Sequence, residues 1–218
     1  MTSTVDLLAD RLVRQFNPAV IDAADVALPV FDEVGPQSVS HAPLFVEIEA
    51  CLVRTRSAMW LVKEGFKQPL ALFRCILALP KGRGPFKRKL ADKIRYDVAQ
   101  LPYNDSFLEW LWGERESDRQ IWLISSADSH FAKRVADYLG LFDGVIASTP
   151  QKTIRGDQKL ARIRAHVSGN GVFDYCGSAM ADLNLFAGAR NAVLVGASDE
   201  VQRHTTSQGN VSLVFDSL

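Results

Sequence analysis

The chain has 218 residues, 47% of them apolar and 23% charged, which fits one large globular domain or one domain with an insertion. Its 25 Lys and Arg residues equal its 25 Asp and Glu residues, so no global field favours nucleic acid or an anionic membrane. The three cysteines show no CxxC spacing, which argues against a disulfide framework or a zinc site and indicates a reducing, cytoplasmic compartment.

The first 43 residues read as a helix followed by an irregular arm. Residues 6–16 carry apolar side chains at helical spacing, and the charged residues within that pattern argue against a secretory signal peptide. Residues 17–43 contain four prolines and mixed polarity, which predicts irregular structure whose role is not readable. We therefore predict that the folded core begins near residue 44.

A strand is predicted at residues 44–48, where the apolar run Leu44-Phe-Val46 leads into Glu47 and Glu49. Residues two apart on a strand point the same way, so both carboxylates would lie at the carboxyl end of the strand, where open α/β sheets place their ligands. Such a pair suits a hard cation or acid/base chemistry. The alternative is a solvated edge strand with two exposed glutamates.

Residues 55–100 form a predicted helical block, broken at Pro69 and at 80–85. The apolar stretch 61–79 is interrupted by charged residues and is shorter than the roughly 18 to 20 apolar residues that a spanning helix needs. We therefore expect a soluble amphipathic region, with an interfacial membrane helix as the alternative. The basic run at 87–89 indicates a solvated surface, with anion binding as the alternative.

Strands and helices alternate from residue 102 onward. A helix begins near Asp105, a second is capped by Asp128 or Ser129 and ends at Gly140, and others are predicted near 157–167, 180–188 and 199–206. Strands are predicted at 121–124, 145–146, 172–176, 192–195 and 211–215. This alternation predicts an α/β fold, a mainly parallel sheet with helices on both faces. No Gly-rich dinucleotide or P-loop motif follows a strand, which disfavours both chemistries.

Residues just past the carboxyl ends of parallel strands converge on one crevice. Acidic, hydroxyl and cationic side chains stand at these positions along the chain. They are Glu47 and Glu49, then Ser125, then Lys159 or Arg155, and finally Ser178 with Asp182.

This order of residues resembles the haloacid dehalogenase-like (HAD) phosphohydrolase superfamily, whose motifs read hhhDxDx[TV], hhh[ST], Lys and GDxxxD. The resemblance covers residues 44–215 and is closest to the phosphoserine-phosphatase-like branch, particularly HAD domains fused to UbiA-type prenyltransferases. It includes Leu101-Pro-Tyr-Asn104, the stretch 139–143 and Gly177-Ser-Ala-Met-Ala-Asp-Leu183. It implies a Rossmann-like core of residues 44–54 and 101–218, with 55–100 inserted as a helical cap.

The resemblance also implies a mechanism. The first carboxylate attacks phosphorus, the second serves as acid and then as base, and the hydroxyl and the lysine hold the phosphoryl oxygens. Magnesium would neutralise the phosphate charge, bound near Glu47, Glu49, Ser178 and Asp182. The catalytic set implied for this chain is Glu47, Glu49, Ser125 and Lys159, with Arg155 as the alternative to the lysine.

The sequence departs from the family pattern at the reacting centre. Glu47 and Glu49 replace aspartates, Ala50 and Cys51 replace the following Gly and Thr, and Ser178 replaces an acid. One extra methylene moves a carboxylate by about 1 to 1.5 Å, a misplacement that costs about 100-fold in rate. Mg²⁺ tolerates little distortion of its ligand set.

These departures predict a HAD-fold protein with little or no phosphatase activity and a binding or partner role. The alternative is an active Mg²⁺-dependent phosphomonoester hydrolase that uses Glu47 and Glu49. By analogy with the family, the ligand would be a small phosphate-bearing molecule and the partner a membrane prenyltransferase. The chain would then be cytoplasmic, or held at a membrane through that partner, and nucleic acid is not expected.

Overall fold

The structure described here is that of the unit His41–Leu218. The computed structural model describes residues 42–167 and 171–215. The predicted N-terminal helix at 6–16 and nearly all of the arm at 17–43 lie outside the described residues. None of the helices in the described part is long and apolar enough to span a bilayer.

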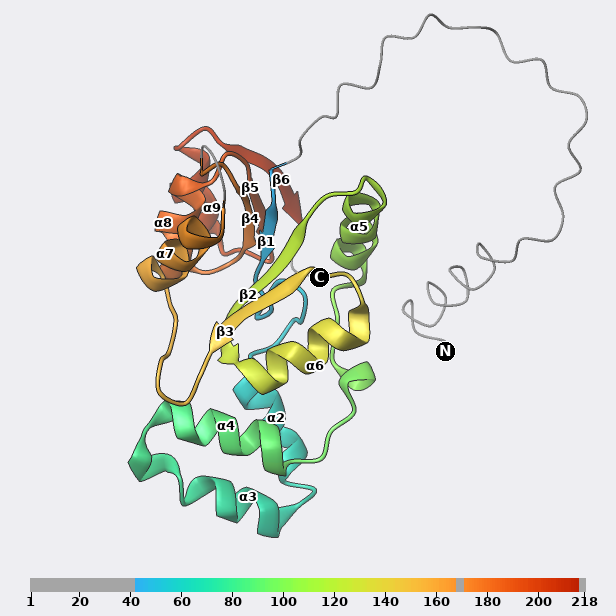
Figure 1. The fold of residues 1–218 in the computed structure, drawn as a ribbon, viewed down its shortest axis with the longest axis vertical. Coiled ribbons are helices and arrows are strands. Elements are labelled where there is room, and N and C mark those ends of the chain that lie inside the picture. Colours follow the sequence, from blue (N-terminus) through green and yellow to red (C-terminus); the bar gives the residue numbers. More distant parts are fainter. Residues whose placement is uncertain (1–41, 168–170, 216–218) are drawn as a thin grey trace, which may run out of the picture. The chain divides into compact units, whose positions relative to one another are not determined.

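A six-stranded, wholly parallel sheet forms the centre of the fold (Figure 1), in the spatial order β3-β2-β1-β4-β5-β6. The strands are β1 (Leu44–Val46), β2 (Ile121–Asp128), β3 (Gly144–Ser148), β4 (Asp174–Gly177), β5 (Ala192–Val195) and β6 (Val211–Phe215). The chain order doubles back next to β1, which places the switch point of the topology beside that strand. The predicted parallel α/β sheet is confirmed.

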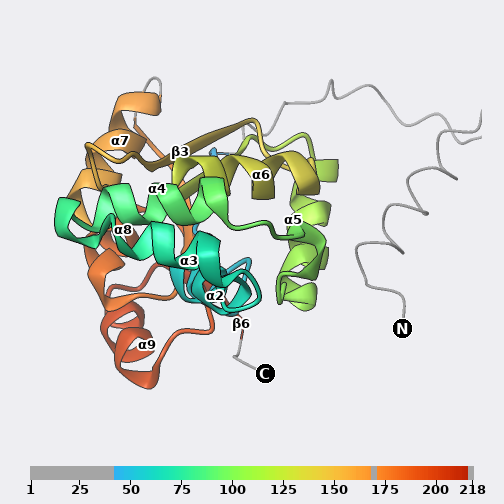
Figure 2. The same ribbon diagram turned by 90° about the horizontal axis from the view of Figure 1, so that it is seen from below.

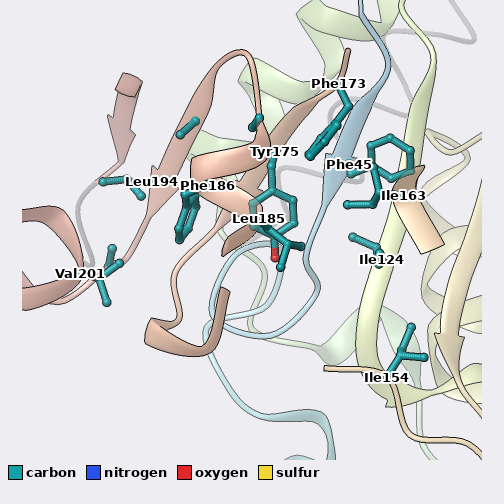
Figure 3. Packing of buried hydrophobic residues seen from close by; sticks show 13 residues of the cluster. Phe45, Ile124, Ile154, Ile163, Phe173, Tyr175, Leu185, Phe186, Leu194 and Val201 are labelled. Carbon is teal, nitrogen blue, oxygen red and sulfur yellow. The ribbon is translucent and has the colours of Figure 1, made fainter. Parts of the chain in front are cut away.

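Helices cover both faces of the sheet. Figure 1 shows α5 (Asp105–Glu116) and α6 (Ser129–Leu139) on one side, and α7 (Asp157–His166), α8 (Leu183–Gly188) and α9 (Asp199–Thr206) on the other. The second side holds a core of large buried side chains, in which Phe45 and Phe173 meet edge to face with ring centroids 6.0 Å apart (Figure 3). Such dry, interlocked packing is the main stabilising contribution of a sheet–helix interface.

Polar residues fix the helix ends where the sequence predicts them. The side chain of Asn104 accepts from the Phe107 amide at the start of α5, and that of Asp128 accepts from the His130 amide at the start of α6. Gly140 follows α6 with φ of 65°, a left-handed conformation that glycine adopts without a Cβ penalty. The predicted start of α5 and the predicted start and end of α6 are confirmed.

Two strands differ in length from their predictions. β1 ends at Val46 instead of residue 48, because the Glu47 carboxylate accepts from the backbone amides of Ile48 and Glu49 and the chain turns away from the sheet. β2 runs to Asp128 instead of residue 124, with an irregular register against β3 between Ser125 and Asp128. Strand ends are decided by these side-chain hydrogen bonds, which periodicity does not report.

Three α-helices make up most of residues 55–100, here named the helical block. They are α2 (Ser57–Gly65), α3 (Pro69–Ile76) and α4 (Arg83–Lys93), with short 3₁₀ turns at Leu79–Lys81 (η1) and Val98–Gln100 (η2). A helix begins at Pro69 as predicted, whereas the second break is shorter than the predicted 80–85, because α4 already begins at Arg83 and includes Pro85. α4 contacts β2 and α6, whereas α3 lies at the far side of the block from the sheet (Figures 1 and 2).

Candidate functional site

Four buried polar side chains meet at the carboxyl ends of β1, β2 and β4. Glu47 follows β1, Ser125 lies in β2, Lys159 comes from the first turns of α7, and Asp182 follows β4. Each is less than a twentieth exposed, so their charges are held out of water. The convergence that the strand-end rule predicts for these four residues is therefore present, while their catalytic roles stay predictions.

Both oxygens of the Glu47 carboxylate accept hydrogen bonds from the protein. Oε1 accepts from the Ser125 hydroxyl, from the Ile48 amide at 3.0 Å and from the Glu49 amide at 3.4 Å, and Oε2 is ion-paired with Lys159. Burial raises the pKa of Glu47, the Lys159 ammonium opposes that rise, and the Asp182 carboxylate adds to it. Among the described residues, each oxygen of Glu47 therefore has at least one protein donor, and Oε2 has Lys159 alone.

Lys159 is shared between two carboxylates. Its Nζ lies 3.0 Å from each Asp182 oxygen as well as against Glu47. Burial alone would lower the pKa of Lys159, but the two neighbouring carboxylates outweigh it and raise the pKa. Tyr175 donates from its hydroxyl to Asp182 at 2.8 Å, and burial together with that carboxylate raises the tyrosine pKa.

Gly156 allows α7 to bring Lys159 to this place. Its φ is 43°, and a Cβ at this position would lie 2.9 Å from the Ala181 carbonyl oxygen, beside Asp182. Only glycine combines that φ with so close a backbone approach. The loop before α7 and the turn after β4 can therefore touch, which sets the lysine next to the aspartate.

The Glu49 carboxylate binds outside this cluster. Its carboxylate accepts from the Ser57 amide at 3.2 Å and from the Ser57 hydroxyl at 2.5 Å, at the first residue of α2. Arg56, at the N-cap position, makes no side-chain capping bond, so Glu49 caps this helix from eight residues upstream. The predicted shared orientation of the two glutamates is wrong, because β1 ends before both of them and the chain turns between them.

The remaining predicted residues lie nearby in less enclosed positions. Arg155 is exposed, whereas Lys159 is buried against Glu47. Ser178 directly follows β4 and is half-buried. Cys51 is buried, and burial raises the pKa of its thiol well above the ordinary value, which does not suit a nucleophile.

Contacts between α4 and the site were not predicted from the sequence. Lys87 donates to the Ser126 carbonyl at 3.0 Å, and Arg88 donates to Asp128 at 3.1 Å and to Ser129 at 2.8 Å. Burial lowers the pKa of Lys87. The interpretation of this run as a solvated surface is therefore wrong for Lys87 and Arg88, which fasten the helical block to the end of β2.

The sequence also did not predict that Tyr175 would bind Asp182 or that Ser57 would bind Glu49. A tyrosine in the middle of a buried strand is a signal for the first, since a buried phenol needs a hydrogen-bond partner. Ser57 carries the weaker signal of a residue type common at helix starts. Neither signal identifies the partner.

The donor set was compared with what magnesium requires. Mg²⁺ prefers about six oxygen ligands in near-octahedral order. In the described residues no three His, Cys, Asp or Glu side chains are grouped to hold a metal ion, and the two carboxylates that do meet are bridged by the Lys159 ammonium. In this arrangement the residues do not fit Mg²⁺, and the magnesium site that the family resemblance implies stays a prediction.

The chain resembles a curated protein in sequence. The chain is 30% identical over 155 residues to the uncharacterized protein y4nM of Sinorhizobium fredii, matching 71% of this chain and 30% of that protein. The chain thus spans less than a third of the length of this relative. No family model matches the sequence.

Solved structures with a similar fold include HAD-type hydrolases. A phosphoserine phosphatase in its phospho-aspartyl analogue form superposes with a TM-score of 0.54 at 10% identity, covering 82% of this chain and 94% of that one. A haloacid dehalogenase-like hydrolase of Streptococcus pneumoniae gives 0.53 at 13% identity, with 82% and 95% covered. A Bordetella pertussis protein of unknown function gives 0.60 at 11% identity, with 81% and 99% covered. The chain therefore has the HAD-like, Rossmann-type α/β fold.

Proposed function

We propose that this chain is a HAD-fold protein with degenerate catalytic motifs, little or no phosphatase turnover, and a binding or partner role. One observation carries the proposal. Glu47, at the nucleophile position of the family pattern, has both oxygens engaged by protein donors in a buried cluster with Lys159 and Asp182. A carboxylate attacks phosphorus through a free lone pair aimed at the reacting atom.

Glu49 and the narrow pocket beside Ser57 also support a low phosphatase turnover. The carboxylate of Glu49, at the acid/base position, accepts hydrogen bonds from the amide and the hydroxyl of Ser57. The pocket next to Ser57, Lys87 and Asp128 is too narrow to admit a water molecule. A substrate phosphate at Glu47 would have to displace Lys159 from its ion pair before any chemistry could begin.

A partner role agrees with the length of the curated relative. The matched region is 30% of y4nM, so in that protein the matched region stands beside much further sequence. We propose that this fold acts as a module next to another enzyme, for which the family resemblance suggests a membrane prenyltransferase. Its natural ligand would be a small phosphate-bearing molecule held near Lys87 and Arg155. These two side chains are close enough for the Arg155 charge to help lower the pKa of Lys87.

A phosphatase assay tests the proposal. We expect the purified chain to hydrolyse p-nitrophenyl phosphate with Mg²⁺ at the rate of the Glu47→Ala variant. A triple variant, Glu47→Asp, Glu49→Asp and Ser178→Asp, shows whether the family residue types regain turnover on this backbone. Magnesium-dependent hydrolysis by the unaltered chain that Glu47→Ala abolishes would establish the active hydrolase and overturn the proposal.

A further inference from the structure

The helical block exposes an unusual number of large apolar side chains. Six of them come from the end of α2, α3 and η1 and are here named the outer face: Phe66, Leu70, Phe73, Ile76, Leu77 and Leu79. Leu70 is 79% exposed and Phe66 is 73% exposed, so most of the surface of each residue lies outside the core. Leu70, Phe73 and Leu77 follow one another at helical spacing along α3 and its C-cap, so they share one face, and exposed apolar surface of this kind marks an interaction site.

The composition of α3 explains why its outward side is apolar. Leu72 and Cys75 are buried on one side, against the rest of the block, while Leu70 and Phe73 are exposed on the other. A helix that is apolar all round is normally covered on every side. Here α3 lies at the far side of the block from the sheet, and no described element covers its outer side (Figures 1 and 2).

Charge is also concentrated in this block. Residues 55–100 contain eleven Lys and Arg against three Asp and Glu, in a chain whose totals are 25 and 25. Lys63, Lys67, Arg74 and Lys81 are exposed beside the apolar residues. The chain as a whole is neutral, so the positive charge of the block is offset by excess acid in the rest of the chain.

These two features select one class of partner. Protein interfaces are depleted in lysine, whereas helices that lie in a membrane interface combine Leu and Phe with Lys and Arg. We propose that the outer face binds the surface of an anionic phospholipid bilayer, with α3 lying in the plane of the interface. The sequence favoured a soluble amphipathic region here, with an interfacial helix as the alternative, and the exposure of the apolar side chains is the ground for proposing that alternative.

Vesicle co-sedimentation of the full chain tests this proposal. We expect binding to vesicles with about 30% phosphatidylserine to exceed binding to pure phosphatidylcholine at least tenfold, since each nearby Lys or Arg contributes about fivefold. Binding should weaken at about 0.5 M salt, where charges are strongly screened. Equal binding to both vesicles, or none to either, overturns the proposal.

Matched variants assign the binding to the outer face. Leu70→Gln with Phe73→Gln removes apolar surface that is already exposed, so the fold should keep its thermal midpoint while vesicle binding falls at least tenfold. Leu213→Gln, on β6, is the apolar control, and Arg74→Glu with Lys152→Glu form the charge pair, of which only the first should weaken binding. If the Gln pair instead abolishes a dimer of the chain and leaves vesicle binding unchanged, the outer face is a self-association surface and the lipid assignment is wrong.

Discussion

At the scale of single residues, the centre of the site is one ammonium between two buried carboxylates. Glu47, Lys159 and Asp182 together carry one excess negative charge when all are ionised. Burial is the main reason why the pKa of Glu47 is raised even though a lysine touches it, and the Asp182 charge adds to that rise. The lysine is therefore the group on which the cluster depends.

Removing that ammonium should be costly and pH-dependent. Lys159→Met leaves two adjacent carboxylates uncompensated, and we expect the free energy of unfolding near neutral pH to drop by about 3 to 5 kcal/mol. The pKa of Glu47, already raised from 4.5, would rise further in the folded variant. A raised folded-state pKa favours folding at low pH, so the deficit should shrink as the pH falls through that pKa.

Urea denaturation near pH 7.5 and near pH 5 measures both effects. Lys152→Met, at an exposed lysine, is the control and should change the free energy of unfolding by less than about 0.5 kcal/mol. A Lys159→Met deficit that stays the same at both pH values would contradict this account of the cluster.

At the scale of elements, the start of α2 depends on a carboxylate outside the helix. Glu49 binds the amide and the hydroxyl of Ser57, which links the loop after β1 to the first helix of the block. The same loop carries Ala50 with φ of 64°, a left-handed conformation rarely adopted by residues other than glycine. The helical block is therefore joined to the sheet by local hydrogen bonds as well as by α4.

A double-mutant cycle tests the capping role of Glu49. We expect Glu49→Ala and Ser57→Ala each to lower the free energy of unfolding by about 1 kcal/mol, and the double variant to cost little more than either single one. Chemical denaturation gives the coupling energy, with Glu109→Ala on the exposed side of α5 as the control. Strictly additive losses would mean that the two side chains do not act as one cap.

At the scale of the whole molecule, several buried groups hold their protons more tightly than they would in the unfolded chain. Burial raises the pKa of Cys51 and Cys176 well above 9.0, and that of Tyr175 well above 10.0. Above those ordinary values the unfolded chain loses protons that the folded chain keeps. A raised folded-state pKa therefore gives stability that is lost as the pH rises.

We expect the chain to lose stability between pH 9.0, the ordinary cysteine value, and pH 10.0, the ordinary tyrosine value. Each cysteine contributes a slope of up to about 1.4 kcal/mol per pH unit. Urea midpoints measured under reducing conditions at increasing pH give the profile, and Cys176→Ala should remove one cysteine's share of the slope. A flat profile over this range would contradict the burial of these groups.

Local patterns determined much of the fold. Apolar alternation, helix caps at Asn104 and Asp128, and the glycine after α6 fixed the type and order of the elements, because these signals act over a few residues of backbone. The rule that strand ends converge brought Glu47, Glu49, Ser125, Lys159 or Arg155, Ser178 and Asp182 to one edge of the sheet. It did not say which of these side chains would touch.

Only the tertiary structure decided what those side chains contact. Lys159 meets Glu47 across 112 residues of sequence, Glu49 turns to Ser57, and Lys87 crosses to the end of β2. Long side chains choose among several rotamers, and the choice depends on donors and acceptors that other elements bring within hydrogen-bond distance. The exposure of the outer face is likewise a property of packing, because the same apolar residues would read as core wherever another element covered them.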